Sequence, residues 1–186
     1  EEKPTGEISL GAGVGSEGTS VGFAVSENNY MGKGIKLNAS LRASEERVTG
    51  LFSVLNPNYN YSDNEIATTI RSTVTDRMEN YGYKSSNTGF SLGTIFEQYD
   101  SLNVGPTLHI GHETLDTNQS ASESLKKQEG SYFDAKFSYF IDYDKRNQKF
   151  QTSDGFRSKF TQSIPIISED NALVNGYEFS KYEQFN

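Results

Sequence analysis

Apolar and polar residues alternate with a period of two along most of the chain. The clearest run is 35–43, where every odd-numbered residue is apolar and every even-numbered residue is polar or charged. A strand with one apolar face has this period, whereas a helix has a period of about 3.6. Nine more runs follow the rule less strictly, at 7–14, 21–26, 48–55, 66–74, 90–97, 102–110, 133–143, 156–164 and 173–185. The pattern predicts ten β-strands and almost no helix.

Most of these runs exceed the roughly 5–6 residues usual for soluble sheets and approach the 9–11 of a tilted membrane-spanning strand. Their polar positions are mainly Gly, Ser, Thr and Asn, as expected beside a water-filled lumen. We therefore predict an all-β fold, an antiparallel up-and-down transmembrane β-barrel. The side chains expected to face lipid are Ile8, Leu10, Val21, Phe23, Leu37 and Leu41, and those expected to face the lumen are Lys36, Arg42, Arg71 and Lys136.

The composition agrees with a barrel better than with a globular core. Only 33% of the 186 residues are hydrophobic and the mean hydropathy is −0.67, but 12% are aromatic. A globular core uses about 45–50% apolar residues, and disordered chains contain few aromatics. Hydropathy alone would predict a soluble protein. A barrel strand needs an apolar side chain only at every second position, which explains the deficit.

Charge and cysteine content exclude several classes of function. The net charge of −8 and the pI near 4.8 argue against a nucleic-acid partner, which requires a basic face. The absence of Cys excludes disulfides, thiolate metal sites and cysteine nucleophiles. No apolar run is long enough for a transmembrane helix, and the charged start Glu1-Glu2-Lys3 is not expected of a signal peptide.

Aromatic residues gather in every second connection between the predicted strands. These connections fall on one rim of an up-and-down sheet and carry Tyr30, Tyr59, Tyr61, Tyr99, Tyr143 and Phe150. The arrangement is typical of an aromatic girdle at a membrane interface. The alternative is that these rings pack on neighbouring strands.

Three groups of residues resemble chemical sites only superficially. Residues 13–18 have the glycine spacing of a dinucleotide-binding loop, but a second strand follows where a helix is needed. His109 and His112 lie three positions apart on a strand and so point to opposite faces. Asp142, Asp144 and Asp154 lack the frame of a calcium loop. We expect no catalytic residue, cofactor or metal, and hence no enzyme.

Several local sequences together resemble the BamA family of outer-membrane protein assembly factors. Pro4-Thr5-Gly6 resembles the junction where the last periplasmic repeat enters the barrel, and three later segments resemble turns of that barrel. The residues that carry these turn motifs are Asn29, Tyr30, Gly32 and Gly34 in the first, Asn56, Pro57 and Tyr59 in the second, and Asp144, Arg146, Asn147 and Gly155 in the third. One departure is Gln151, where the family usually has proline.

The resemblance implies the N-terminal part of a sixteen-strand outer-membrane barrel, with about ten strands in this chain. Residues 1–5 would end the linker from the periplasmic repeats, and residues 6–186 would belong to the barrel. The implied function is assembly and insertion of outer-membrane β-barrel proteins in a Gram-negative bacterium. The implied partners are outer-membrane lipid, unfolded outer-membrane proteins and, through regions absent here, accessory assembly subunits.

The first predicted strand, residues 6–15, matches the strand that forms one side of the lateral gate in that family. The residues assigned to it are Gly6, Ile8, Leu10, Gly11, Gly13 and Gly15. Glycines weaken a strand, and an edge strand offers unpaired backbone groups to an incoming strand. The alternative is that the glycines only relieve crowding in the lumen.

Two other functions stay open at this point. One is a secretion pore of the partner-secretion or autotransporter-assembly type. The other, from a different class, is a soluble β-sheet ligand-binding domain of the sandwich or lipocalin type.

Overall fold

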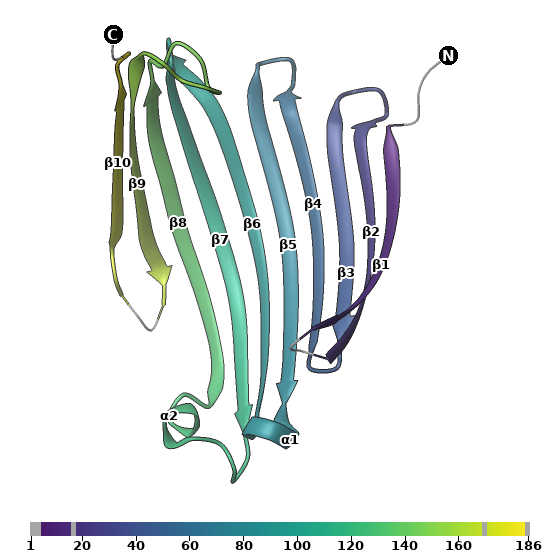
Figure 1. The fold of residues 1–186 in the computed structure, drawn as a ribbon. Coiled ribbons are helices and arrows are strands. Elements are labelled where there is room, and N and C mark those ends of the chain that lie inside the picture. Colours follow the sequence, from purple (N-terminus) through teal and green to yellow (C-terminus); the bar gives the residue numbers. More distant parts are fainter. Residues whose placement is uncertain (1–4, 16–17, 169–170, 185–186) are drawn as a thin grey trace.

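A computed structural model (Figure 1) describes residues 5–15, 18–168 and 171–184. It contains ten strands and two helices of four residues each. The strands are β1 (Gly6–Gly15), β2 (Gly18–Tyr30), β3 (Ile35–Ser44), β4 (Arg47–Tyr59), β5 (Asn64–Arg77), β6 (Tyr83–Tyr99), β7 (Leu102–Thr117), β8 (Gly130–Asp144), β9 (Gly155–Ile167) and β10 (Val174–Tyr182); the helices are α1 (Met78–Tyr81) and α2 (Glu123–Lys126). Pro4 and most of the expected linker lie outside the described residues.

All ten strands form one antiparallel sheet whose spatial order is the chain order, β1 to β10. The predicted all-β, up-and-down fold is confirmed. Within the described residues, β1 pairs only with β2 and β10 only with β9, so the sheet has two edges and is a partial barrel. Of the helices described, none is long and apolar enough to cross a membrane.

The register gives the sheet one apolar and one polar face. Because directly opposite residues share a face, the apolar face can be followed from Phe52 on β4 through Ile70 and Phe90 to Ile110 on β7. The six side chains predicted to face lipid lie on this face, and the four charged ones lie on the other, lumen face. Large apolar side chains stay exposed across the sheet, so this face is covered by no other part of the described chain.

The apolar band crosses the sheet obliquely. The row of paired residues that contains Phe23 and Leu41 becomes polar at Ser72 and Thr88. Towards β9 the apolar residues lie nearer the end of the sheet that carries the β8–β9 turn. Apolar residues therefore do not follow one row of paired residues across the sheet, as is expected where strands are tilted in a transmembrane barrel.

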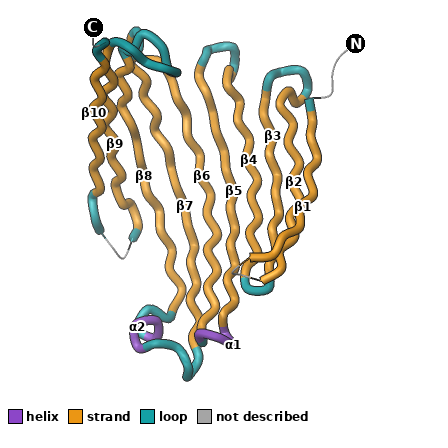
Figure 2. Tube along the Cα trace, in the orientation of Figure 1, coloured by secondary structure: helices purple, strands orange, loops and turns teal. Residues whose placement is uncertain are grey.

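Several strands are longer than the apolar pattern indicated. The alternating run predicted for this strand ends at residue 110, but β7 continues to Thr117 and pairs there with β6. Backbone pairing needs no apolar side chain, so a strand can extend beyond the apolar band. Figure 2 shows β5 to β8 reaching past the other strands to the two short helices. Helix α2 ends at Lys126, and its first turn is capped by the Ser122 hydroxyl, which accepts from the Leu125 N–H.

Candidate functional site

Strand β1 is the most exposed strand of the sheet. Each of its ten residues is exposed, and Ile8, Leu10 and Val14 are 70%, 82% and 86% exposed. One side of β1 pairs with β2 in continuous register from Gly6↔Glu27 to Gly15↔Gly18. Within the described residues its other side pairs with no strand. Backbone N–H and C=O groups are therefore available along that edge.

Among the described residues, few atoms lie close to the lumen-facing glycines of β1. Gly11, Gly13 and Gly15 lie on the lumen face, opposite Gly22, Ser20 and Gly18. A Cβ built on Gly11 or Gly15 would meet no atom within 4 Å, and one on Gly13 would meet only the Ser20 Oγ at 3.9 Å. Gly6 differs, since its Cβ would lie 3.0 Å from a Glu27 carboxylate oxygen. The small residues thus leave open space beside the lumen face of the edge strand.

The β2–β3 turn is held by the asparagine that the sequence motif contains. Asn29 Oδ1 accepts a 2.7 Å hydrogen bond from the Gly34 N–H across the turn. Gly32 and Gly34 have φ values of 70° and 67°, a conformation that favours glycine. Asn29, Gly32 and Gly34 therefore act together to shape the turn, and Tyr30 ends β2 opposite Ile35.

The β4–β5 turn repeats this geometry with a residue that the motif did not include. Asn58 Oδ1 accepts from the Asp63 N–H at 3.0 Å, the same five-residue reach as from Asn29 to Gly34. The predicted Asn56 supports the approach to the turn by accepting from the Asn58 N–H at 3.1 Å. Comparing the spacing of the two turn sequences could have found Asn58.

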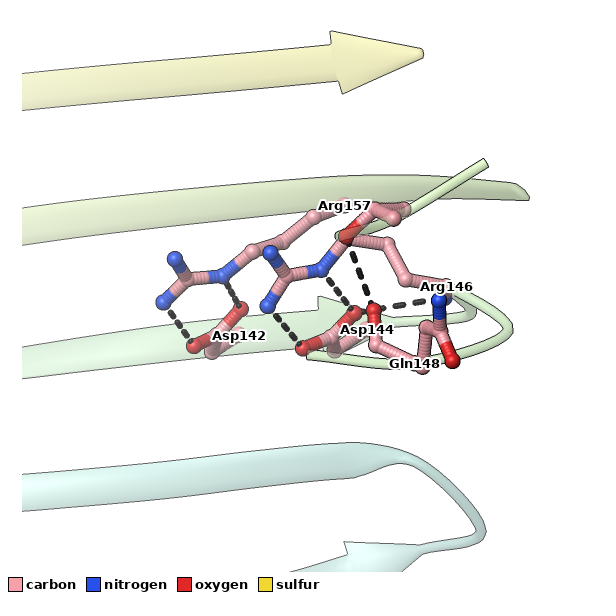
Figure 3. Close-up of polar contacts among 6 residues, drawn as sticks. Asp142, Asp144, Arg146, Gln148 and Arg157 are labelled. Carbon is pink, nitrogen blue, oxygen red and sulfur yellow. Dashed lines mark hydrogen bonds and ion pairs between the residues drawn. The ribbon is translucent and has the colours of Figure 1, made fainter. Parts of the chain in front are cut away.

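The β8–β9 turn contains the four residues predicted for it. Asp144 accepts from Nε and Nη2 of Arg146 at 2.8 and 2.7 Å, and both side chains are largely buried (Figure 3). The hydrogen bonds that the Arg146 guanidinium donates to Asp144 raise the pKa of Arg146. Asn147 Oδ1 accepts from the backbone N–H groups of Ser153 and Asp154. Gly155 has a φ of 97° and begins β9.

Gln151, which replaces the usual proline of the family, has a φ of 53°. A proline is fixed near −65° and could not adopt this backbone conformation. The Gln151 carbonyl accepts from Gln148 Nε2 at 2.7 Å. The turn therefore keeps the Asp, Arg, Asn and Gly positions of the motif with a different local path at residue 151.

A second ion pair beside this turn was not predicted. Asp142 on β8 accepts from Nε and Nη2 of Arg157 on β9 at 2.9 and 2.6 Å (Figure 3). Strand alternation places both residues on polar positions. Their juxtaposition depends on the register of β8 against β9, which the alternation does not specify.

The lumen face also carries a basic groove near the opposite end of the sheet. Arg42, Arg47 and Arg71, from three consecutive strands, line a groove of about 510 Å³.

The described residues contain no group of three or more His, Asp and Glu side chains placed to hold a metal ion. His109 and His112 lie on opposite faces, as their spacing predicted.

A single tilted antiparallel sheet with one apolar face, one polar face and tightly bonded turns defines the wall of a membrane β-barrel. Comparison with known families agrees with this class, since residues 29–185 match the Omp85 superfamily domain. The chain belongs to the Omp85 superfamily.

The solved structure of BamA from Haemophilus ducreyi lacking POTRA domains 1–3 is similar over 97% of this chain, with a TM-score of 0.67 and 20% sequence identity. The predicted BamA-like barrel is thereby confirmed as a fold. The chain spans 38% of the length of that BamA chain. No curated protein sequence matches it.

Proposed function

We propose that this chain forms part of the wall of a bacterial outer-membrane barrel that assembles and inserts other outer-membrane β-barrel proteins, with β1 as one side of a lateral gate. Membership in the Omp85 superfamily and the BamA-like fold support the general role. The proposed partners are outer-membrane lipid, unfolded outer-membrane proteins and accessory assembly subunits. The proposed role is in protein handling and is non-enzymatic.

The observation that carries the gate proposal is that β1 combines an edge that is unpaired within the described residues with glycines at three lumen-facing positions. In hydrocarbon an unpaired backbone group costs several kcal/mol, so a substrate strand that pairs with this edge is strongly favoured. Because glycine has no side chain, the lumen side of β1 is unobstructed at these positions. Nothing in the described residues packs against Gly11 or Gly15. The edge can therefore exchange partners at low packing cost.

Photo-crosslinking in the full-length protein tests this function. A photoreactive side chain at Ser9 or Gly11 on β1 is expected to capture outer-membrane proteins during their synthesis. The matched control is Thr69, a lumen-facing residue of β5 that has a neighbouring strand on both sides. Equal capture at both sites would contradict the gate. Capture of one exported protein, rather than many barrel proteins, would instead favour a secretion pore.

A further inference from the structure

Two lumen-facing arginines, Arg42 and Arg71, differ from the other arginines of the sheet. Arg77, Arg146 and Arg157 each bind a carboxylate, with nitrogen–oxygen distances of 2.6–2.7 Å. Within the described residues, Arg42 and Arg71 form no ion pair and donate no hydrogen bond. A guanidinium is always charged and presents five donors in a fixed fork. These two side chains therefore keep their full capacity to bind an anion.

Two glycines lie between Arg42 and the edge of the sheet that β1 forms. The row of paired residues that contains Arg42 runs from β1 to β4 on the lumen face as Gly11↔Gly22↔Arg42↔Thr49. A Cβ built on Gly11 would meet no atom within 4 Å, and one on Gly22 would meet only the Leu41 carbonyl oxygen at 3.9 Å. This row therefore contributes no side chain between Arg42 and the edge of β1.

The neighbouring rows on the lumen face of β1 and β2 also contain only small residues. Gly13 and Ser20 lie on one side of the glycine row, and Ser9 and Ala24 lie on the other. All four line a groove of about 410 Å³ that reaches from β1 to Arg42. This groove shares Ser20 and Arg42 with the basic groove described above. The edge of β1 and the arginine side chains are therefore joined by one continuous depression.

A strand that adds to β1 would have its lumen-facing side chains within reach of Arg42. Its backbone would lie three strand spacings from β3, or about 14 Å. An extended arginine reaches roughly 7 Å from its Cα and a glutamate roughly 4 Å, which leaves about 3 Å for a charged hydrogen bond. Side chains usually stand upright on a sheet, and the row of glycines lets these two lie along its surface instead. Arg71, on β5, is two strand spacings farther from the added strand.

We propose that Gly11, Gly22 and Arg42 form a slot that binds the carboxylate of a lumen-facing Asp or Glu in the strand that adds to β1. This inference rests on the proposed function, in which β1 pairs with a substrate strand, and it names an acidic residue as the one preferred opposite Gly11. A guanidinium binds a carboxylate through two parallel hydrogen bonds, whereas a Lys or Arg at this position would meet Arg42 with like charge. A slip of one residue would turn the acidic side chain to the other face. The slot therefore selects substrate strands and fixes their register.

Capture of synthetic peptides by the full-length protein in detergent micelles tests the slot. A photoreactive phenylalanine in place of Leu10 reports pairing with β1, and it leaves the groove open because Leu10 lies on the apolar face. The probes are biotinylated peptides of about ten residues, the length of a membrane-spanning strand, in which apolar residues alternate with Thr. One central Thr is replaced by Glu, Gln or Lys. The Glu peptide should reach half-maximal capture at a concentration about three- to fivefold lower than the Gln peptide, as for an exposed ion pair.

Three substitutions separate the slot from the general charge of the groove. Arg42→Gln should remove the preference for the Glu peptide, and Arg42→Glu should transfer the preference to the Lys peptide. Gly22→Val adds a side chain to the slot, at a position with room for its Cβ, and should also remove the preference. Arg71→Gln is the matched control, because it removes the same charge from the same basic groove at a greater distance from β1, and it should keep the preference.

Each variant is compared with its own capture of the Gln peptide, so a loss of folding is not mistaken for a loss of preference. Equal capture of the Glu and Gln peptides before any substitution at Arg42 would overturn the slot, although capture at β1 would still support the gate. Loss of the preference in Arg71→Gln to the same extent as in Arg42→Gln would also overturn it, in favour of a diffuse field. Failure to capture any peptide would overturn the gate and the slot together.

Discussion

Gly155 lies where the β8–β9 turn leaves no room for a side chain. Its φ is 97°, and an added Cβ would lie 2.2 Å from the Lys145 carbonyl oxygen and 2.9 Å from the Arg146 Cα. Because these neighbours are backbone atoms, they cannot rotate away. We expect Gly155→Ala to lower the free energy of unfolding by about 1–3 kcal/mol, measured by urea titration of the protein in detergent micelles.

Gly50→Ala is the matched control for this substitution. Gly50 lies in β4, and no atom would come within 4 Å of its Cβ. Alanine loses less chain entropy than glycine, so the stability should be unchanged or slightly higher. Equal losses for the two variants would show that the close approach at Gly155 is not maintained.

Asp100 and Lys145 form an ion pair that joins the β6–β7 and β8–β9 turns. The hydrogen bond from Lys145 lowers the pKa of Asp100, and the same bond raises the pKa of Lys145. The contribution of this ion pair to the stability of the two turns is therefore complete above the ordinary pKa of Asp100. It is lost as the pH falls through the lowered pKa. Protection of the amides in residues 145–154, expressed relative to the intrinsic exchange rate at each pH, should fall on acidification through this range, and Asp100→Asn should remove the part of this fall that comes from Asp100.

The turn residues show how far a sequence motif specifies a site. Asn29, Asn147 and Gly155 were predicted from their motifs, and each makes the hydrogen bond or has the backbone conformation that shapes its turn. Asn58 was missed because the neighbouring Asn56-Pro57 carried the resemblance. The Asp142–Arg157 pair was missed because it joins two strands, and alternation gives the face of a residue but not its partner.

At the scale of elements, Glu46 connects two loops at the end of the sheet opposite the β2–β3 and β4–β5 turns. Its carboxylate accepts from Arg77 Nε at 2.7 Å and from Asn80 Nδ2 at 3.1 Å, which ties the β3–β4 turn to α1. Charged hydrogen bonds of this kind contribute about 1.5–3 kcal/mol each when shielded. We expect Glu46→Ala to accelerate amide exchange in residues 78–82 by about tenfold, since 1.4 kcal/mol corresponds to that factor.

Glu123→Ala provides the comparison for Glu46. Glu123 pairs with Lys126 inside α2 and its side chain is 83% exposed, so the pair contributes little. Removal of the Glu123 carboxylate should leave the amide exchange rates in residues 78–82 of the α1 region unchanged. Unaltered exchange at α1 in Glu46→Ala would mean that the backbone bond from the Asp76 N–H to the Glu46 carbonyl holds the two loops without the side chain.

The strands themselves were largely predictable, whereas their irregularities were not. Alternation in 35–43 and similar runs identified all ten strands and both faces, because a half-covered strand needs this period. β-Bulges directly before Tyr30, Tyr59 and Tyr99, where one strand advances one residue more than its partner, interrupt the period by one residue. A sequence cannot distinguish such an interruption from the start of a turn, so the strands were predicted to end before these tyrosines.

For the whole molecule, the two unpaired edges predict how residues 1–186 behave alone. In the part of the chain that the structure describes, the edges of β1 and β10 present unpaired backbone groups, and the apolar face is exposed from β1 to β10. We expect the isolated polypeptide to aggregate in buffer without detergent. Sedimentation velocity checks this, and a well-dispersed monomer without detergent would contradict the barrel assignment and favour a soluble sheet.

The identity of spatial order and chain order has a consequence for the folding kinetics of the sheet. Within the described residues every strand pairs only with its sequence neighbours, so pairing can spread outward from each turn and each new contact closes only a short loop. Loop closure of this kind costs little entropy, and low contact order favours rapid folding. The sheet can therefore grow by one hairpin at a time from an existing edge, without a nucleus that joins distant parts of the chain.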